Sequence, residues 1–122
     1  MAAPSKLWVP DRRDMIWIDF NPQAGREMKD EHPMMVLSTK AFNERTGIVI
    51  GVPMTHAESN ETNPFAVKFG GPKGDVGYVL SHQPKSFDWR MRKARPHSWK
   101  QIPPSVFESV CEGLNSIISL CA

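Results

Sequence analysis

Residues 15–20, MIWIDF, form a short run of β-branched and aromatic side chains in which Trp17 and Asp19 alternate with isoleucines. This period of two predicts a β-strand. The polar residues 21–33, NPQAGREMKDEHP, follow it and are too many for a hairpin turn. A loop of this length in a small domain is often functional, so we expect a strand that leads into a functional loop.

Further short strands follow along the chain. Residues 34–37 predict a second strand, and residues 47–52, GIVIGV, are the most apolar run and predict the central one. Pro53 is expected to end that strand and to present Thr55 at its tip. The remaining expected elements are a helical turn at residues 41–43 capped by Ser38 or Thr39, a flexible loop at 57–63, strands at 65–69, 78–80 and 84–87, and a turn at 70–72.

The end of the chain changes to helical spacing. Apolar side chains recur on one face at Val106, Phe107, Val110, Cys111, Leu114, Ile117, Ile118 and Cys121. Pro103 and Pro104 are tolerated at a helix start. The pattern therefore predicts an α+β, mainly β fold: a small twisted barrel of short strands with one C-terminal helix, as a single domain over residues 1–122.

Composition is that of an ordinary globular protein. The 122 residues are 40% apolar and 23% charged, and no apolar run has the length of a membrane span or of a signal peptide. We therefore expect a cytoplasmic protein. On one helix, Cys111 and Cys121 would lie about 15 Å apart, too far for a disulfide, so both are expected to be apolar thiols.

Positive charge gathers near residues 85–100. Lys85, Arg90, Arg92, Lys93, Arg95 and Lys100 face a single acid, Asp88, with Trp89 and Trp99 between them. Basic and aromatic side chains together suit single-stranded nucleic acid. The alternative is a solvated strand edge whose charges prevent aggregation.

Several motifs, in order, resemble the MazF/PemK family of toxins. They are residues 14–22 (DMIWIDFNP), 25–27 (GRE), 33–38 (PMMVLS), 42–43 (FN), 46–47 (TG), 52–55 (VPMT) and 83–88 (QPKSFD). The similarity extends from about Val9 to Leu120. It implies an SH3-like barrel, a homodimer, and a toxin neutralised by a MazE-like antitoxin whose disordered acidic tail covers the basic groove.

The resemblance also implies sequence-selective cleavage of single-stranded RNA without a metal or other cofactor. In the family the 2′-hydroxyl attacks the adjacent phosphate and leaves a 2′,3′-cyclic phosphate and a 5′-hydroxyl. Glu27 and Thr55 occupy two catalytic positions of the family. At the third, His32 stands where the family has Arg, and Arg13 replaces the family's opening Gly.

The change at residue 32 leaves two alternatives. Arg keeps its charge and binds phosphate through two donors, whereas His titrates near neutral pH and can transfer a proton. His32 is therefore expected either to take part in altered chemistry, paired as acid and base with His82, or to abolish activity. A metal site from Glu27 and these histidines is disfavoured, because no paired-ligand spacing is present.

Further residues are candidates for substrate binding: Phe20, Asn43, His82, Gln83, Lys85, Arg90 and Arg92. Phe20, beside the first loop, is expected to touch a base, and Gln83 to lie near the cleaved phosphate. His82 stands where the family has Asp. Trp17, Phe87 and Trp89 are expected to pack in the interior.

A second class of function keeps the fold and loses the catalysis. Such a protein would bind RNA or its antitoxin, or would poison a protein target as the structurally related CcdB gyrase toxins do. A steep salt dependence of RNA affinity would separate the RNA-binding alternatives from the last one.

Overall fold

The computed structural model of the chain describes residues 7–21 and 30–119, most of which lie in strands and two helices. The elements, in chain order, are β1 (Asp14–Asp19), β2 (Glu31–Val36), α1 (Lys40–Thr46), β3 (Ile48–Thr55), the 3₁₀ helix η1 (Glu58–Thr62), β4 (Ala66–Gly70), the 3₁₀ turn η2 (Pro72–Gly74), β5 (Val76–Leu80), β6 (Lys85–Asp88), β7 (Arg95–Gln101) and α2 (Pro104–Ile118). The α+β, mainly β prediction is confirmed.

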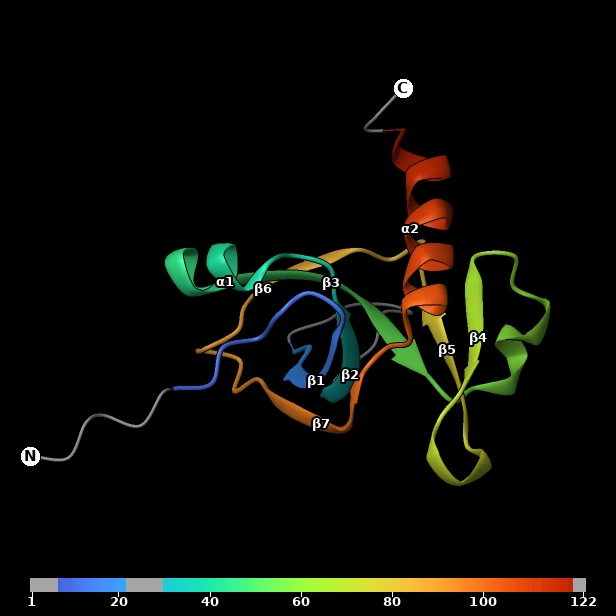
Figure 1. The fold of residues 1–122 in the computed structure, drawn as a ribbon, viewed down its shortest axis with the longest axis horizontal. Coiled ribbons are helices and arrows are strands. Elements are labelled where there is room, and N and C mark those ends of the chain that lie inside the picture. Colours follow the sequence, from blue (N-terminus) through green and yellow to red (C-terminus); the bar gives the residue numbers. More distant parts are fainter. Residues whose placement is uncertain (1–6, 22–29, 120–122) are drawn as a thin grey trace, which may run out of the picture.

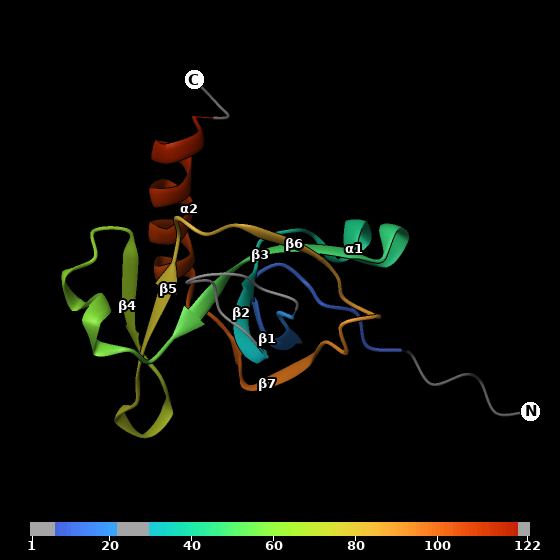
Figure 2. The same ribbon diagram turned by 180° about the vertical axis from the view of Figure 1, so that it is seen from behind.

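The strands pair antiparallel in the order β4-β5-β3-β2-β1-β7, and β6 pairs with β3. Figure 1 shows β1, β2 and β7 curling into one half of the molecule, while the β4–β5 hairpin stands beside α2 in the other half. Figure 2 shows the same division from behind, with β3 crossing between the halves. The sheet is thus a curled half-barrel with a terminal helix.

β3 is the central strand, as predicted, but Pro53 does not end it. Residues 51–53 of β3 pair with β2, while the other edge of β3 pairs first with β6 at residues 48–51 and then with β5 at residues 54–55. Pro53 lies between those last two pairings, where a missing N–H breaks no ladder hydrogen bond. The strand therefore continues to Thr55.

The short helix α1 has the predicted cap. Thr39 Oγ1 accepts a hydrogen bond from the Phe42 amide (3.4 Å), and Gly47, with φ 74°, closes the helix by donating to the Asn43 carbonyl. The helix continues beyond the expected turn to Thr46.

Two hydrophobic clusters form the core, one in each half. The first lies under α2 and contains Met15, Met35, Val52, Met54, Phe69, Val79, Ile102, Phe107 and Val110. The second lies inside the curl and contains Ile16, Ile18, Phe20, Met34, Val36, Val49, Phe87 and Trp89. Phe87 and Trp89 are interior packing residues, as predicted, whereas Trp17 is only half-buried.

The apolar face of α2 is covered only near its start. Phe107 and Val110 are buried, whereas Ile117 and Ile118 are 45% and 42% exposed. Cys111 is a half-buried free thiol, and Cys121 lies outside the described residues. Among the described helices, none has the length and apolar character of a membrane-crossing segment.

Three local predictions differ from the structure. β2 begins at Glu31, so His32 and Pro33 belong to a strand and not to the loop. Residues expected as a flexible loop form η1. β7 was not predicted as a strand, because its sequence RPHSWKQ has little apolar character; as the edge strand on β1 it tolerates Pro96 and polar side chains.

Candidate functional site

A row of side chains crosses the sheet at the end of β3. Thr55 is the register partner of Tyr78 on β5, and Tyr78 is the partner of Lys68 on β4. Cross-strand partners point to the same face of a sheet and lie about 5 Å apart. Lys68, Tyr78 and Thr55 therefore stand side by side on one face.

The row extends toward His32 on the other side of β3. β2 and β3 pair as far as Met34 and Pro53, and His32 and Thr55 each lie two residues beyond that pair on their strands. On β1, the partner of His32 is Ile18. Two of the predicted site residues thus lie on adjacent strands, close to the ends at which these strands pair.

The hydroxyl of Thr55 is held by the backbone that follows it. Its Oγ1 accepts a hydrogen bond from the Ala57 amide (3.1 Å). A hydroxyl that accepts through one lone pair keeps its own proton for donation. Half-buried Thr55 can therefore offer an O–H donor to a phosphate oxygen.

His32 is half-buried, and its ring packs edge-on against Phe20 with centroids 5.7 Å apart. Phe20 also packs against Phe87 at 5.0 Å and is 0% exposed. The expectation that Phe20 touches a base is therefore wrong. Its ring points into the curl because it continues the inward-facing positions of β1, and there it supports the imidazole of His32.

Glu27 lies outside the described residues, but both flanks of its segment are anchored. The side-chain Nδ2 of Asn21 donates to Asp30 Oδ1 (2.8 Å), and the backbone N–H of Asp30 donates to Asn21 Oδ1 (3.0 Å). The Phe20 amide also donates to the Asp30 carbonyl (2.8 Å). These bonds hold the two flanks together, two residues from His32.

His82 and Gln83 follow β5, where Gln83 Nε2 lies 3.2 Å from His82 Nε2. The His82 ring packs against Phe65 at 5.5 Å, and its buried Nδ1 has no hydrogen-bond partner within the described part of the chain. Because His32 packs on Phe20 and His82 on Phe65, the structure does not bring the two imidazoles together within one chain. The predicted acid–base pair of histidines therefore receives no support.

Asn43 is fully buried, and its side chain makes three hydrogen bonds. It donates to the carbonyls of Pro10 (2.8 Å) and Ser38 (3.2 Å) and accepts from Ser38 Oγ (2.5 Å). The expected RNA contact is therefore wrong, since a buried amide needs these partners. Asn43 ties the N-terminal segment to the loop before α1.

The three basic candidates are placed differently. Arg92 stacks over Phe87 at 4.4 Å. Its Nη1 donates to the carbonyls of Asp19 (3.0 Å) and Asn21, so the guanidinium stabilises the end of β1. Arg90 is exposed, stacks over Trp89 at 4.7 Å and donates to the Glu44 carbonyl (3.2 Å). Lys85 is half-buried on β6, beside Gly51 of β3.

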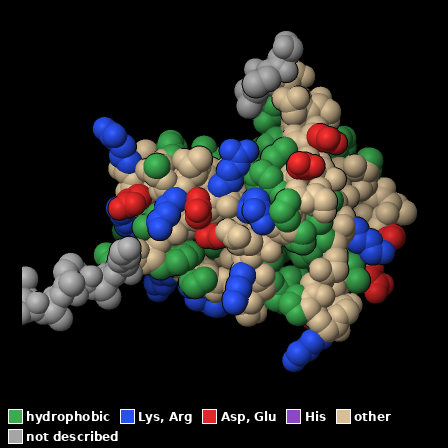
Figure 3. All heavy atoms as spheres, in the orientation of Figure 1, with side chains coloured by type: hydrophobic (Ala, Val, Ile, Leu, Met, Phe, Trp, Pro, Cys, Tyr) green, Lys and Arg blue, Asp and Glu red, His purple; other side chains and the backbone are tan. Residues whose placement is uncertain are grey.

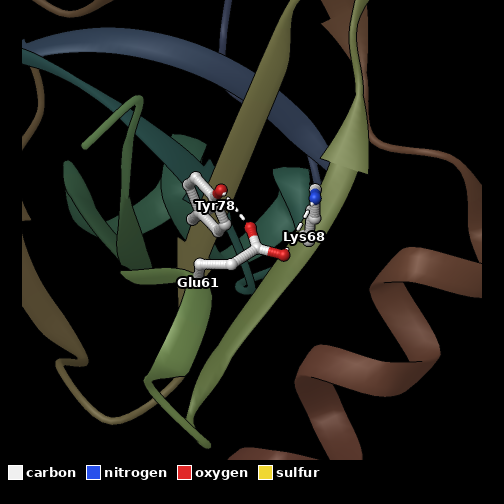
Figure 4. Close-up of polar contacts among 3 residues, drawn as sticks. All are labelled: Glu61, Lys68 and Tyr78. Atoms are coloured by element: carbon white, nitrogen blue, oxygen red, sulfur yellow. Dashed lines mark hydrogen bonds and ion pairs between the residues drawn. The ribbon is translucent and has the colours of Figure 1, made fainter. Parts of the chain in front are cut away.

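A polar network next to Thr55 was missed in the sequence. Glu61 of η1 accepts a hydrogen bond from Tyr78 Oη (2.5 Å) and forms an ion pair with Lys68 Nζ (3.0 Å). Figure 4 shows the Glu61 carboxylate between these two donors. The hydrogen bond from Tyr78, then that from Lys68, lowers the pKa of Glu61, and the same bond to Glu61 raises the pKa of Tyr78. No motif marks these residues, because they meet only through strand register.

The network forms the wall of a cavity of about 610 Å³, which His56, Glu58, Gly74, Asp75 and Val76 also line. A chain of four aromatic rings lies beside this cavity. The ring centroids are 5.0 Å apart for Trp17 and His97, 5.2 Å for His97 and Trp99, and 5.6 Å for Trp99 and His56. Burial, then the charges of His56 and Arg95, lower the pKa of His97. Within the described residues, no group of three or more His, Cys, Asp or Glu side chains is arranged to hold a metal ion.

Comparisons with known proteins agree with this architecture. The family model of PemK-like, MazF-like toxins of type II toxin–antitoxin systems matches residues 11–118. The endoribonuclease toxin MazF of Escherichia coli K12 is 40% identical over 87 residues, which are 71% of this chain and 76% of that protein.

Solved structures show the same fold. MazF from Deinococcus radiodurans superposes with a TM-score of 0.82 at 34% identity, covering 93% of this chain and 99% of that one. A MazE–MazF structure from the same organism gives a TM-score of 0.74 at 30% identity, covering 92% and 97%. The chain therefore belongs to the family of PemK-like, MazF-like toxins of type II toxin–antitoxin systems.

Proposed function

We propose that this protein is the toxin of a type II toxin–antitoxin system and a metal-independent endoribonuclease that cuts single-stranded RNA at selected sequences. The observation that carries the proposal is the pairing of β2 with β3, the strands that carry His32 and Thr55, beside the anchored flanks of the segment with Glu27. The relative from Escherichia coli is named an endoribonuclease, which supports the same activity.

The proposed reaction is attack by the RNA 2′-hydroxyl on the neighbouring phosphorus. Glu27 takes the proton of the 2′-hydroxyl while the bond from O2′ to phosphorus forms. The bond from phosphorus to O5′ breaks, and protonated His32 gives its proton to the leaving oxygen. Thr55 donates to a non-bridging phosphate oxygen, where negative charge increases in the transition state. The products are a 2′,3′-cyclic phosphate and a 5′-hydroxyl.

The remaining candidates divide by their placement. Gln83, His82, Lys85 and exposed Arg90 stay proposed RNA contacts, because they lie on the surface or are half-buried. Arg92 positions the end of β1 and, with it, the start of the segment that carries Glu27. Phe20 and Asn43 are fully buried and are assigned structural roles.

The proposed partners are a second copy of the chain and a MazE-like antitoxin. An apolar cavity of about 640 Å³ lies between α2 and the sheet, lined by Leu37, Ile50, Pro84, Cys111, Leu114 and Ile118 among others. Figure 3 shows hydrophobic side chains gathered beside α2. We propose that the homodimer forms through this apolar face beside α2. We also propose that residues 1–122 form a single toxin domain and that the protein is cytoplasmic. The relative solved with MazE supports the antitoxin assignment.

The test is cleavage of a long unstructured RNA by purified protein in EDTA, beside the Glu27→Ala, Thr55→Ala and His32→Arg variants. We expect site-selective cuts with cyclic-phosphate ends in the wild type. We also expect losses of at least a hundredfold in Glu27→Ala and about tenfold or more in Thr55→Ala, in line with the loss of a general base and of one donor.

The substitution at residue 32 also favours a second candidate, a binding protein without catalysis. A silent wild type with an active His32→Arg variant would show an intact nuclease disabled at one residue. If neither the wild type nor any variant cleaves RNA but the wild type binds it, the result would favour the binding function and reject the enzyme.

A further inference from the structure

We propose that the cavity walled by Glu61, Lys68, Tyr78 and His56 is a nucleobase pocket that selects guanine at a nucleotide next to the cleaved bond. The inference rests on the proposed function and deepens it by naming the base that this part of the site reads. It is independent of which residue protonates the leaving group.

Position is the first argument. Tyr78 is the direct register partner of Thr55, and such partners lie about 5 Å apart with side chains on the same face. His56, on the cavity wall, directly follows Thr55 in the chain. A phosphate bound by the Thr55 hydroxyl would therefore place the base of a neighbouring nucleotide at the mouth of this cavity.

The second argument is the hydrogen-bonding capacity of Glu61. An ionised carboxylate has about four acceptor sites, two on each oxygen. Tyr78 occupies one site on Oε2 and Lys68 one site on Oε1, which leaves one site on each oxygen. The side chain is 54% exposed, so the remaining sites are accessible from the cavity.

Two adjacent acceptors match guanine among the four bases. Guanine presents two neighbouring N–H donors, N1–H and the N2 amino group, on its Watson–Crick edge. Adenine and cytosine present one amino group beside a ring acceptor, and uracil presents one N–H between two carbonyls. Bidentate pairing to a fixed carboxylate therefore discriminates for guanine, as bidentate pairs do elsewhere in base recognition.

Lys68 and His56 complete the pocket. The ammonium of Lys68 has three donors, of which Glu61 uses one, so it can donate to the guanine O6 next to N1–H. His56 Nδ1 lies 2.8 Å from the Val76 carbonyl, and its ring packs edge-on against Trp99 at 5.6 Å. This exposed but anchored ring offers a face on which a base can stack.

Charge decides between a base and a phosphate as the occupant. The cavity lining carries three carboxylates, Glu58, Glu61 and Asp75, against the single ammonium of Lys68. Like charge repels the RNA backbone there, while a neutral base with N–H donors is attracted. The lowered pKa of Glu61 keeps its carboxylate ionised at neutral pH.

The experiment is cleavage of a random-sequence RNA pool followed by sequencing of the cut ends. We expect guanine enrichment at one position beside the cut in the wild type, reduced about tenfold in Glu61→Gln, which keeps the shape of the side chain and removes its charge. Glu108→Gln, at an exposed position of α2, is the matched control and should leave the guanine enrichment unchanged. Thermal melting confirms that both variants are folded.

A second measurement separates this inference from the proposed function. RNA oligonucleotides with guanosine or inosine at the selected position are compared by equilibrium binding, since inosine lacks the N2 amino group. We expect inosine to weaken binding about tenfold for the wild type and less than threefold for Glu61→Gln.

Cleavage without guanine enrichment, or with enrichment unchanged in Glu61→Gln, overturns the pocket and leaves the nuclease standing. No cleavage, together with inosine-sensitive binding that depends on Glu61, rejects the nuclease and supports the pocket. A protein that neither cuts nor binds RNA overturns both.

Discussion

Residue 32 is His where the family resemblance leads us to expect Arg, and the structure shows what surrounds the imidazole. His32 lies in β2, opposite Ile18 and against the edge of the Phe20 ring. A planar aromatic ring suits that packing. An imidazole cannot bind phosphate through the two parallel donors of a guanidinium, so the proposed role of His32 is the transfer of a proton to the leaving oxygen.

His97 provides a pH-dependent contribution to stability. Because burial lowers its pKa below the ordinary 6.5, the unfolded chain takes up a proton near that pH while the folded chain does not. The contribution is fully present above pH 6.5 and is lost as the pH falls toward the folded pKa. The free energy of unfolding should therefore decrease between pH 7 and pH 5, with a slope from this residue of at most about 1.4 kcal/mol per pH unit.

The test is urea denaturation of the wild type and of His97→Asn across that range. Asparagine keeps an acceptor for the Trp99 amide, which bonds to His97 Nδ1 at 3.0 Å. We expect a shallower pH dependence in the variant, since one titrating group is gone while the other histidines remain. Equal slopes in the two proteins would contradict the assignment.

Among the elements, strand β7 shows what the sequence could and could not predict. Strands with strong alternation or apolar runs, such as β1 and β3, were predictable because their side chains meet the core on regular positions. β7 has only one buried side chain, His97, and its pairing depends on β1, far away in the chain. Local pattern therefore indicated charge and aromatic character but not a strand.

The same distinction applies to the candidate site. Family motifs singled out His32 and Thr55, but the structure places both inside strands, where the sequence predicted a loop and a position beyond a strand end. Phe20 and Asn43 were misassigned as RNA contacts, because the sequence alone does not show that both side chains are fully buried. Glu61, Lys68 and Tyr78 lie 7 and 10 residues apart, and no local rule joins them before β4 and β5 are paired in register.

The junction between β7 and the β4–β5 hairpin depends on glycine. A Cβ at Gly71 would lie 2.5 Å from the Trp99 ring, whereas a Cβ at Gly70 meets nothing within 4 Å. The ring cannot retreat easily, because Phe69, His97 and His56 pack around it. Gly71→Ala should therefore lower the free energy of unfolding by about 1–3 kcal/mol.

Gly70→Ala is the matched control for that change and should differ from the wild type by less than about 1 kcal/mol. Chemical denaturation of the two variants checks the comparison, and Trp99 fluorescence should report a displaced ring only in Gly71→Ala. Equal stabilities of the two variants would show that Trp99 does not lock β7 onto the hairpin.

For the whole molecule, the uncovered half of α2 is the feature that one chain leaves unexplained. Figure 1 shows the helix extending beyond the sheet. Ile50 and Ile118, which line the apolar cavity, are 37% and 42% exposed, and Ile117 near the helix end is 45% exposed. A second copy that covers these side chains would gain about 1.5–3 kcal/mol for each one fully buried. The dimer would then hold two RNA sites at a fixed relative position.

This arrangement predicts that Ile50→Glu raises the dimer dissociation constant by at least tenfold, because a charge in the cavity between α2 and the sheet must be desolvated on association. Met91→Glu, at a residue 79% exposed and outside the cavity, introduces the same charge and should leave the constant unchanged. Sedimentation equilibrium of the wild type and both variants measures it directly. A wild type that is monomeric at micromolar concentration, or a dimer that Ile50→Glu leaves intact, would place any interface elsewhere. A dimer weakened by Ile50→Glu, with guanine selection preserved at its remaining sites, would show that assembly and base recognition occupy separate surfaces.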